Sequence, residues 1–482
     1  MISMKRLRRA PVVPTAILVC LALTGAVAAS DRGAAAHRSL VTADGYVVSQ
    51  GAKNNPLCAL PRVCYSPALL QQAYDFPSGK KAPTGVGQTI VIVVPYGSPT
   101  IEADLATFDS AFNIAPPRSF SIVTAKGAGG IGSTDPDVLI GWGVETSASV
   151  EWAHAMAPGA NIVLAVSPTD DLTDVVATEA QLLPLYPGAV VSQSFGDDET
   201  DPSAQDAFKA LHDVFAAATG LGGTIFASAG DFGAAACPDP VYGCGSVPVA
   251  SYPASDPLVT GVGGTEGNPY PGGLLRPHGG YGGEQVWNES DTFGLATGGA
   301  PSVLFDSPSY QQGITGNTAR TVPDVSYNAA INGGIQVYYG LFGRFITFGG
   351  TSAGPPQWAA IAAIANEARA ARRQHSLGLL NTALYAIAQD RRSYRKDFND
   401  ITVGTNALSP FPGFTFPGFN AGPGYDLATG LGTPDVERLI RDLVQMRSDD
   451  HSDDHGPHAN GGGDSHGGQQ GQGGQHHMKS GG

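Results

Sequence analysis

Ser352 lies where a glycine-rich turn enters a long apolar stretch. The turn reads GGTSAGPP over residues 349–356, after a short strand predicted over 345–348 and before a helix predicted over 357–372. A serine at such a place is close to backbone N–H groups and to the positive end of the helix dipole, which stabilise a negatively charged oxygen. The position therefore suits a nucleophile. It also suits a serine that only caps the helix, but the flanking glycines and Pro356 favour the nucleophile.

A nucleophilic serine needs a base that takes its proton, and the base of a subtilisin is missing from this sequence. A subtilisin has a His followed by Gly-Thr at the start of a helix, and an Asp followed by Thr or Ser and Gly after the first strand. Here the first predicted strand runs into PYG at residues 95–97, and His154 lies between two alanines. The subtilisin assignment is therefore excluded.

Several motifs instead resemble those of the sedolisins, the serine-carboxyl peptidases, in the order in which that family has them. Besides the turn of Ser352, they are GVETSASVEWAHAMAPGA at 143–160, SAGDFG at 228–233, YPA at 252–254, VGGT at 262–265 and VPDVS at 322–326. The resemblance spans about residues 57–446. It implies a subtilisin-like fold and a peptidase acting on polypeptides, in which Ser352 is the nucleophile, Glu145 is the base and Asp231 lies in the oxyanion hole.

These assignments predict a peptidase that acts at acidic pH. A glutamate, with an ordinary pKa of about 4.3, is a weaker base than imidazole and works best under acidic conditions. Asp231 can donate a hydrogen bond to an oxyanion only when it is protonated. Taken alone, Glu145 is also compatible with a solvated helix carboxylate, and Asp231 with an ordinary turn residue after a strand.

The sequence departs from the family at Ser149. Sedolisins carry an Asp four residues after the catalytic Glu, one helical turn along the same face. A serine hydroxyl can still orient Glu145, but it brings no charge. Glu151 is rotated by about 200° from Glu145 and points away, and His154 is interpreted as a packed or surface histidine.

A second departure is the short stretch before the peptidase region. Sedolisins usually have a long N-terminal prodomain, whereas only about 28 residues separate the predicted signal cleavage from Pro56.

Two hypotheses about function follow from these motifs and departures. The first is a secreted, calcium-binding, acid-acting endopeptidase. The alternative is a catalytically weak or inactive sedolisin-like protein that serves as an extracellular binding protein.

A metal site is predicted near the C-terminus. Asp400-Ile401 is followed by AGPGYD at residues 421–426, which matches the calcium loop of the family. Calcium prefers six or more oxygen ligands, and glycines allow carbonyl groups to turn inward. The resemblance implies one Ca²⁺ held by two carboxylates and several backbone carbonyls, from Asp400, Ile401, Gly422, Gly424 and Asp426. Outside this context, the same residues would be an ordinary turn.

The elements that would position these residues alternate between strand and helix. Apolar runs rich in Val and Ile predict buried strands over 89–94, 161–166, 189–195, 224–228 and 258–262. Helical spacing of apolar residues predicts helices over 101–112, 172–185 and 204–218. This alternation predicts an α/β fold with a doubly wound, mainly parallel sheet and helices on both faces. The Gly- and Pro-rich stretch over 263–350 predicts long surface loops and hairpins.

Composition limits the partners. The chain has 27 basic and 42 acidic residues, a net charge of −15, which argues against nucleic acid as a partner. Hydrophobic residues make up 42% of the chain, enough for a core. We expect a monomer that acts on polypeptide.

The two ends differ from the body. A basic start, a short apolar segment and AVA at 26–28 predict a secretory signal peptide over 1–28, rather than a membrane anchor. A short N-terminal segment follows over 29–56, then the peptidase domain over 57–446. The His-, Asp- and Gly-rich end over 447–482 predicts a disordered, solvated tail, with metal scavenging as a weaker alternative.

Removal of the signal leaves four cysteines, at 58, 64, 237 and 244. Pairing between sequence neighbours would suit an oxidising, extracellular compartment. Three pairings remain open, as do free thiols. A zinc site is less favoured, because neither close pair has the two-residue gap of a zinc knuckle.

Overall fold

The computed structural model describes residues 42–43, 46–48, 64–126, 130–235, 247–267, 281–411 and 413–446. These residues belong to one structural unit, Met1–Arg447. The predicted signal peptide over 1–28, most of the segment over 29–56 and the predicted tail over 447–482 lie outside them. Cys64 is disulfide-bonded, but the other cysteines lie outside the described residues, so the predicted pairing stays a prediction.

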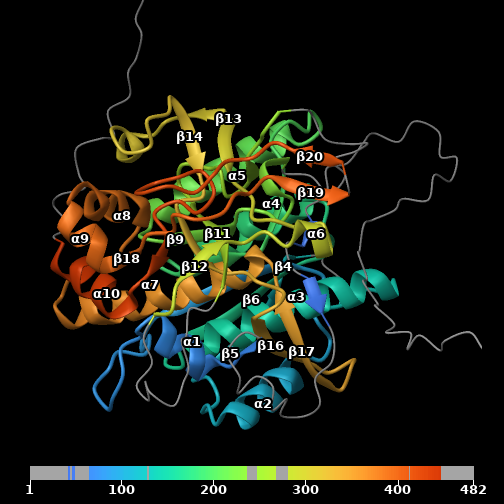
Figure 1. The fold of residues 1–482 in the computed structure, drawn as a ribbon. Helices are drawn as coiled ribbons and strands as arrows, with labels where there is room; N and C mark the ends of the chain where they lie inside the picture. The colour runs from blue at the N-terminus through green and yellow to red at the C-terminus, as the bar shows by residue number, and fades with distance from the viewer. Residues whose placement is uncertain are drawn as a thin grey trace, which may run out of the picture. The chain divides into compact units, whose positions relative to one another are not determined.

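A sheet of eight strands is the centre of the described structure (Figure 1). The strand order is β12-β11-β9-β7-β4-β6-β5, and β15 also pairs with β11. Neighbouring strands are parallel except for β12, which is antiparallel to β11. The strands are β4 Thr89–Pro95, β5 Phe120–Thr124, β6 Asn161–Ser167, β7 Val190–Gln193, β9 Thr224–Ser228, β11 Thr260–Gly267, β12 Glu284–Val286 and β15 Val325–Asn328.

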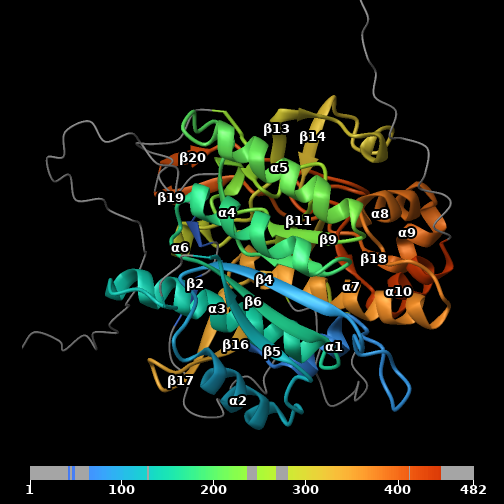
Figure 2. The same ribbon diagram turned by 180° about the vertical axis from the view of Figure 1, so that it is seen from behind.

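Helices cover both faces of this sheet (Figures 1 and 2). Side chains of β4 alternate between two cores, because successive residues of a strand point to opposite faces. Ile90, Ile92 and Val94 pack in the core that contains α3 and α7, whereas Val91 and Val93 pack in the core of α4 and α5. The helices are α1 Pro67–Ala73, α2 Ile101–Phe112, α3 Pro136–Met156, α4 Leu172–Leu182, α5 Gln205–Gly220, α6 Ser290–Phe293, α7 Gly354–Ala371, α8 Leu380–Gln389, α9 Arg391–Asp397 and α10 Val436–Gln445.

Smaller sheets surround the central one. They pair β8 with β1 and β10, β17 with β2 and β16, β16 with β3, β13 with β14, β18 with β21, and β19 with β20. Their bounds are β1 Thr42–Ala43, β2 Tyr46–Val48, β3 Cys64–Tyr65, β8 Phe195–Asp198, β10 Ser251–Tyr252, β13 Ala300–Asp306, β14 Ala319–Val322, β16 Gly334–Tyr339, β17 Arg344–Gly349, β18 Phe398–Asn399, β19 Leu408–Phe411, β20 Phe414–Phe416 and β21 Thr433–Pro434.

The predicted doubly wound, mainly parallel α/β fold is confirmed. Most predicted elements are present with ends within a few residues. The strand predicted over 189–195 is interrupted at Ser194, between β7 and β8, and the helix predicted over 172–185 ends in a 3₁₀ turn, Leu183–Leu185, that contains Pro184. The stretch over 263–350 does contain antiparallel pairs, but it also supplies β15, a buried strand of the main sheet.

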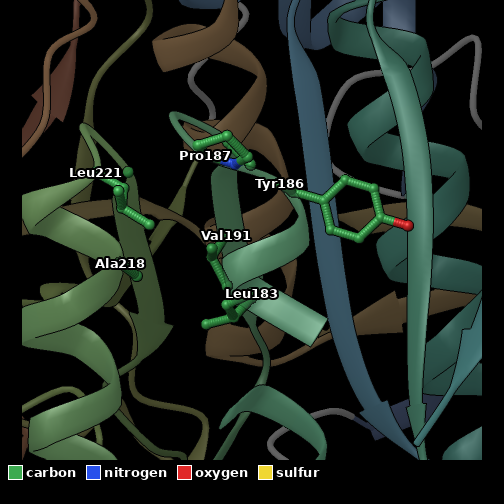
Figure 3. Close-up of a pocket in the computed structure, with 8 residues that line it drawn as sticks. Leu183, Tyr186, Pro187, Val191, Ala218 and Leu221 are labelled. Carbon is green, nitrogen blue, oxygen red and sulfur yellow. The ribbon is translucent and has the colours of Figure 1, made fainter. Parts of the chain in front are cut away.

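An apolar pocket lies at the start of β7, at the end of the strand opposite to Ser194 (Figure 3). Leu183, Val191, Ala218 and Leu221 are among the residues that line it, and no charged side chain does. Tyr186 is the one titratable side chain in this lining, so the pocket lacks the carboxyl groups expected of the catalytic site. Among the helices that the structure describes, none has the length and apolar character that crossing a membrane requires.

Candidate active site

Ser352 is held in a short 3₁₀ turn, Thr351–Ala353, between β17 and α7. Gly350 begins this turn with a φ of 120°, which a glycine adopts readily and other residues avoid. The side chain of Ser352 is buried. Its Oγ donates to the carbonyl of Ser194 at 3.5 Å, and Ser194 Oγ donates to the Ser352 carbonyl at 3.1 Å. These two hydrogen bonds connect the turn Thr351–Ala353, called the serine turn below, to Ser194 at the break between β7 and β8.

Asp231 lies three residues after β9 and is fully buried. The preceding Gly230 has a φ of 99°, so the chain turns sharply as it leaves the strand. Asp231 Oδ1 accepts from the backbone N of Thr351 at 2.8 Å and from Thr351 Oγ1 at 2.7 Å. The structure thus brings Asp231 against the residue that directly precedes Ser352.

Glu145 lies in the middle of α3, which packs against both α7 and the serine turn. The helix begins with Asp135 as N-cap, whose carboxylate accepts from the backbone N of Asp137. Glu145 and Ser149 are both buried, and Ser149 Oγ donates to Glu145 Oε1 at 3.2 Å. The expected contact one helical turn along the same face is present.

Two other polar residues of α3 have separate partners. Glu151 accepts from the backbone N of Tyr338 at 3.0 Å, and burial raises its pKa well above the ordinary value. His154 Nε2 lies 3.0 Å from the carbonyl of Ala115 and 3.4 Å from Asp109 Oδ2. Neither contact involves Glu145 or Ser352. His154 is a packed histidine, as predicted.

Backbone strands of the N-terminal segment lie along two strands that lead to the site. β1 is antiparallel to β8, with Ala43 opposite Phe195, the residue after Ser194. β2 is antiparallel to β17, with Tyr46 opposite Gly349, three residues before Ser352. The sequence alone gave no indication of these pairings.

The residues predicted to bind calcium come together in one loop region. Asp400 Oδ1 and Oδ2 accept from the backbone N of Gly424, both at 3.1 Å, and Tyr394 Oη donates to Asp400 Oδ1 at 3.0 Å. Asp426 Oδ2 accepts from the backbone N of Gly422 at 3.1 Å. Burial raises the pKa of Asp426 above its ordinary value.

This donor set fits a hard cation. Among the described residues, no salt bridge reaches either carboxylate, and the backbone carbonyls of Ile401, Gly422 and Gly424 accept no hydrogen bond. The side chain of Ile401 is a hydrocarbon without a ligand atom, so only its carbonyl could be a ligand. Two carboxylates and three carbonyls, all oxygen, match the preference of Ca²⁺. No group of three or more His, Cys, Asp or Glu suited to a metal occurs in the described ranges, so the backbone would have to supply part of the shell.

Sequence reasoning missed two residues that the structure places in the site, Ser194 and Thr351. Ser194 follows a run of strand-forming residues and looks like part of the strand. Thr351 stands beside Ser352 in GGTS. Its position next to the candidate nucleophile was the available signal, but its contact with Asp231 joins residues 120 positions apart.

Comparisons with known proteins show to which proteins the whole chain is similar. No family model matches the chain. The chain is 32% identical over 394 residues to kumamolisin from Bacillus sp. (strain MN-32), covering 80% of this chain and 64% of the relative. It is 30% identical over 379 residues to sedolisin from Pseudomonas sp. (strain 101), covering 78% of this chain and 60% of the relative. The chain thus spans somewhat less than two thirds of these relatives.

A solved structure of Pseudomonas sedolisin, a serine-carboxyl proteinase complexed with two molecules of pseudo-iodotyrostatin, superposes with a TM-score of 0.67 at 28% identity. The match covers 79% of this chain and 98% of that structure. The chain is thus a homologue of sedolisin and kumamolisin over about four fifths of its length.

Proposed function

We propose that this protein is an acid-acting serine-carboxyl endopeptidase that cleaves polypeptide chains. Ser352 attacks the carbonyl carbon of the peptide bond, while the carboxylate of Glu145 takes the Ser352 proton and later returns it to the leaving amine. Protonated Asp231 donates a hydrogen bond to the oxyanion of the tetrahedral intermediate. Water then hydrolyses the acyl-enzyme by the reverse sequence of proton transfers.

One observation carries this proposal. Asp231 accepts two hydrogen bonds from Thr351 and so lies against the turn that contains Ser352, and the helix α3, which carries the buried Glu145, packs on the same turn. Buried carboxyl groups beside a serine suit catalysis in acid. Glu145 must take up and return a proton, and Asp231 must be protonated to donate a hydrogen bond, and acidic pH favours both. Ser149 supports the alternative of a weak or inactive extracellular binding protein, because it holds Glu145 without the second carboxylate of the family.

Digestion of a denatured protein from pH 2 to pH 7 tests the proposal, with mass spectrometry of the products. Internal cleavage that is fastest at acidic pH is expected. Release of tripeptides from the N-terminus alone would replace the endopeptidase assignment by a tripeptidyl-peptidase one. Rat tripeptidyl-peptidase 1, which is 28% identical to this chain, carries that activity in its name. The absence of products at every pH from a folded protein would favour the binding protein.

The buried carboxyl groups predict that the folded protein is most stable in acid. The exposed Asp390 has a lowered pKa, whereas burial raises the pKa of the carboxyls named next. Burial raises the pKa of Glu179 to about 8, from an ordinary value of 4.5. Further carboxyls with raised pKa values are Asp104, Glu151, Glu199, Glu266, Glu284, Asp397 and Asp435.

A carboxyl whose pKa is higher in the folded state binds more protons when folded, so its contribution is complete below the unfolded pKa and is lost as pH rises through the folded pKa. We therefore expect the free energy of unfolding in urea to fall between about pH 4 and pH 8. Glu179→Gln can keep the hydrogen bond from Gln193 and should flatten this dependence. A stability that rises over the same range would contradict the prediction.

We also propose that the loop of Asp400 and Asp426 holds one structural Ca²⁺, with carbonyls of Ile401, Gly422 and Gly424. The ion would neutralise two carboxylates that lie near each other, and binding to the folded state alone stabilises that state by mass action. At a calcium concentration of 100 times Kd this is about 2.7 kcal/mol, which corresponds to a Tm increase of about 3 °C for a domain of this size.

Thermal unfolding with calcium and with chelator measures this effect. Wild type should lose about 3 °C in chelator. Asp426→Asn keeps an oxygen acceptor but removes a charge, so its Tm should no longer respond to calcium. Asp206→Asn, an exposed carboxylate on α5, is the matched control and should respond like wild type. A wild-type Tm that is unaffected by chelator, with no metal in elemental analysis, would refute the site.

Export to the extracellular space is part of the proposal. It is supported by the signal-like sequence over 1–28 and agrees with the disulfide at Cys64. N-terminal sequencing of the protein from culture medium would show whether the chain begins at Ala29.

A further inference from the structure

Thr351 binds one oxygen of Asp231 through two donors. The backbone N and the hydroxyl Oγ1 of Thr351 both donate to Asp231 Oδ1, at 2.8 and 2.7 Å. The same hydroxyl accepts from the backbone N of Gly230 at 3.2 Å. A hydroxyl has one proton to give, and the Gly230 N–H takes up an acceptor site on the oxygen, so that proton is directed to Asp231. Both side chains are fully buried.

This geometry decides where a protonated Asp231 carries its proton. A neutral carboxyl has one oxygen that donates and one that only accepts. A proton on Oδ1 would be repelled by the two hydrogens that Thr351 directs to this atom. The proton therefore belongs on Oδ2, and Oδ1 is the accepting oxygen. The choice between the two forms matters because only the protonated oxygen can donate to an oxyanion.

We propose that Thr351 is a positioning residue for the peptidase reaction, which fixes the acid form of Asp231 with its proton on Oδ2, the oxygen that donates to the substrate oxyanion. This inference rests on the proposed function, since it assumes that Asp231 serves the oxyanion. Thr351 itself need not touch the substrate. The adjacent Ser352 supplies the attacking oxygen, so one dipeptide provides the nucleophile and orients the acid.

Replacement of the hydroxyl tests the assignment. Thr351→Val keeps the shape but removes the hydrogen bond to Asp231 and the one that the hydroxyl accepts from the backbone N of Gly230. We expect kcat to fall about three- to tenfold with little change in KM, the effect of losing the bond to Asp231. A donor to a carboxylate favours its charged form, so its loss should also move the alkaline limb of the kcat profile to higher pH. Thr351→Ser restores a hydroxyl and should recover both.

A merely structural role of Thr351 would lower activity without moving the pH limb. The proposal is overturned if Thr351→Val has wild-type kcat and pH profile, or if a folded Thr351→Ser is as impaired as the valine variant. Asp231→Asn gives a second check. The two Thr351 donors should turn the amide oxygen toward Thr351 and the amide NH₂ to the place of Oδ2. Adding Thr351→Val to Asp231→Asn should then leave the alkaline limb in place, because no Asp231 proton remains to be lost.

A measurement without turnover separates this inference from the proposed function. The carboxyl carbon of Asp231 can be titrated by ¹³C NMR in the Ser352→Ala protein, with and without Thr351→Val. The titration should move to higher pH when the hydroxyl is absent. An unchanged titration overturns the role of Thr351 whether or not the enzyme is active. If the titration shifts but wild type cleaves no substrate, the proposed peptidase function is refuted and the role of Thr351 toward Asp231 still stands.

Discussion

Ser352→Ala lowers kcat/KM for a denatured protein substrate by about 10³-fold or more, and Glu145→Ala does the same. Without the hydroxyl no acyl-enzyme can form, and without the carboxylate the Ser352 proton has no acceptor on α3. Because the members of one catalytic unit act together, the double variant should be scarcely worse than either single one. Activity of all three is measured at the acidic optimum of wild type.

Glu151→Gln is the matched control for Glu145→Ala. Glu151 lies on the same helix and is buried, but it binds the backbone of Tyr338 and not the serine turn. Its raised pKa means that a neutral glutamine resembles the form present in acid. The control should keep wild-type activity. Losses that simply multiply in the double variant, or activity that survives Ser352→Ala, would place the chemistry elsewhere.

Ser149→Asp raises acidic peptidase activity by about tenfold or more, within the usual range for assisted proton transfer. In wild type, Ser149 Oγ only donates to Glu145 Oε1. Two carboxyl groups at this distance would share a proton and titrate as a pair, with one proton affinity raised and the other lowered. The lowered one provides a base that is ionised at acidic pH.

The pH profiles of wild type, Ser149→Asp and Ser149→Ala are compared on one substrate. Ser149→Ala removes the hydroxyl without adding a carboxyl and should be no more active than wild type. If wild type is already as active as Ser149→Asp, this site positions its base without a second carboxylate. Inactivity of all three would favour the extracellular binding protein, because defects beyond one residue would then be required.

Much of the fold could be predicted because the central strands are apolar on both faces. The strand over 224–228 and the helix over 101–112 have the predicted bounds. The predictions were wrong where the apolar pattern continues but the backbone changes. Pro184 cannot supply the backbone N–H that an α-helix needs, and Ser194 leaves the strand to contact Ser352, which an apolar pattern cannot reveal.

The residue types of the candidate site and its local contact within α3 could be predicted, but its tertiary contacts could not. Glu145 and Ser149 lie one helical turn apart, so helix geometry alone predicts their contact. The link from Thr351 to Asp231 depends on how β9 and the serine turn meet across the sheet. It is a tertiary contact between distant residues, and no local pattern in a single sequence encodes it. The same is true of the pairing of β1 with β8.

Location of the acyl group tests the central claim most directly. Wild type is mixed with a peptide bearing an activated ester at acidic pH, quenched with acid during the first turnover and digested for mass spectrometry. Covalent catalysis accumulates an acyl-enzyme when deacylation is slower than acylation. We predict an acyl group on Ser352 in wild type and none on this peptide in Ser352→Ala. Ester turnover with the acyl group on another residue would contradict the assignment of Ser352 as the nucleophile.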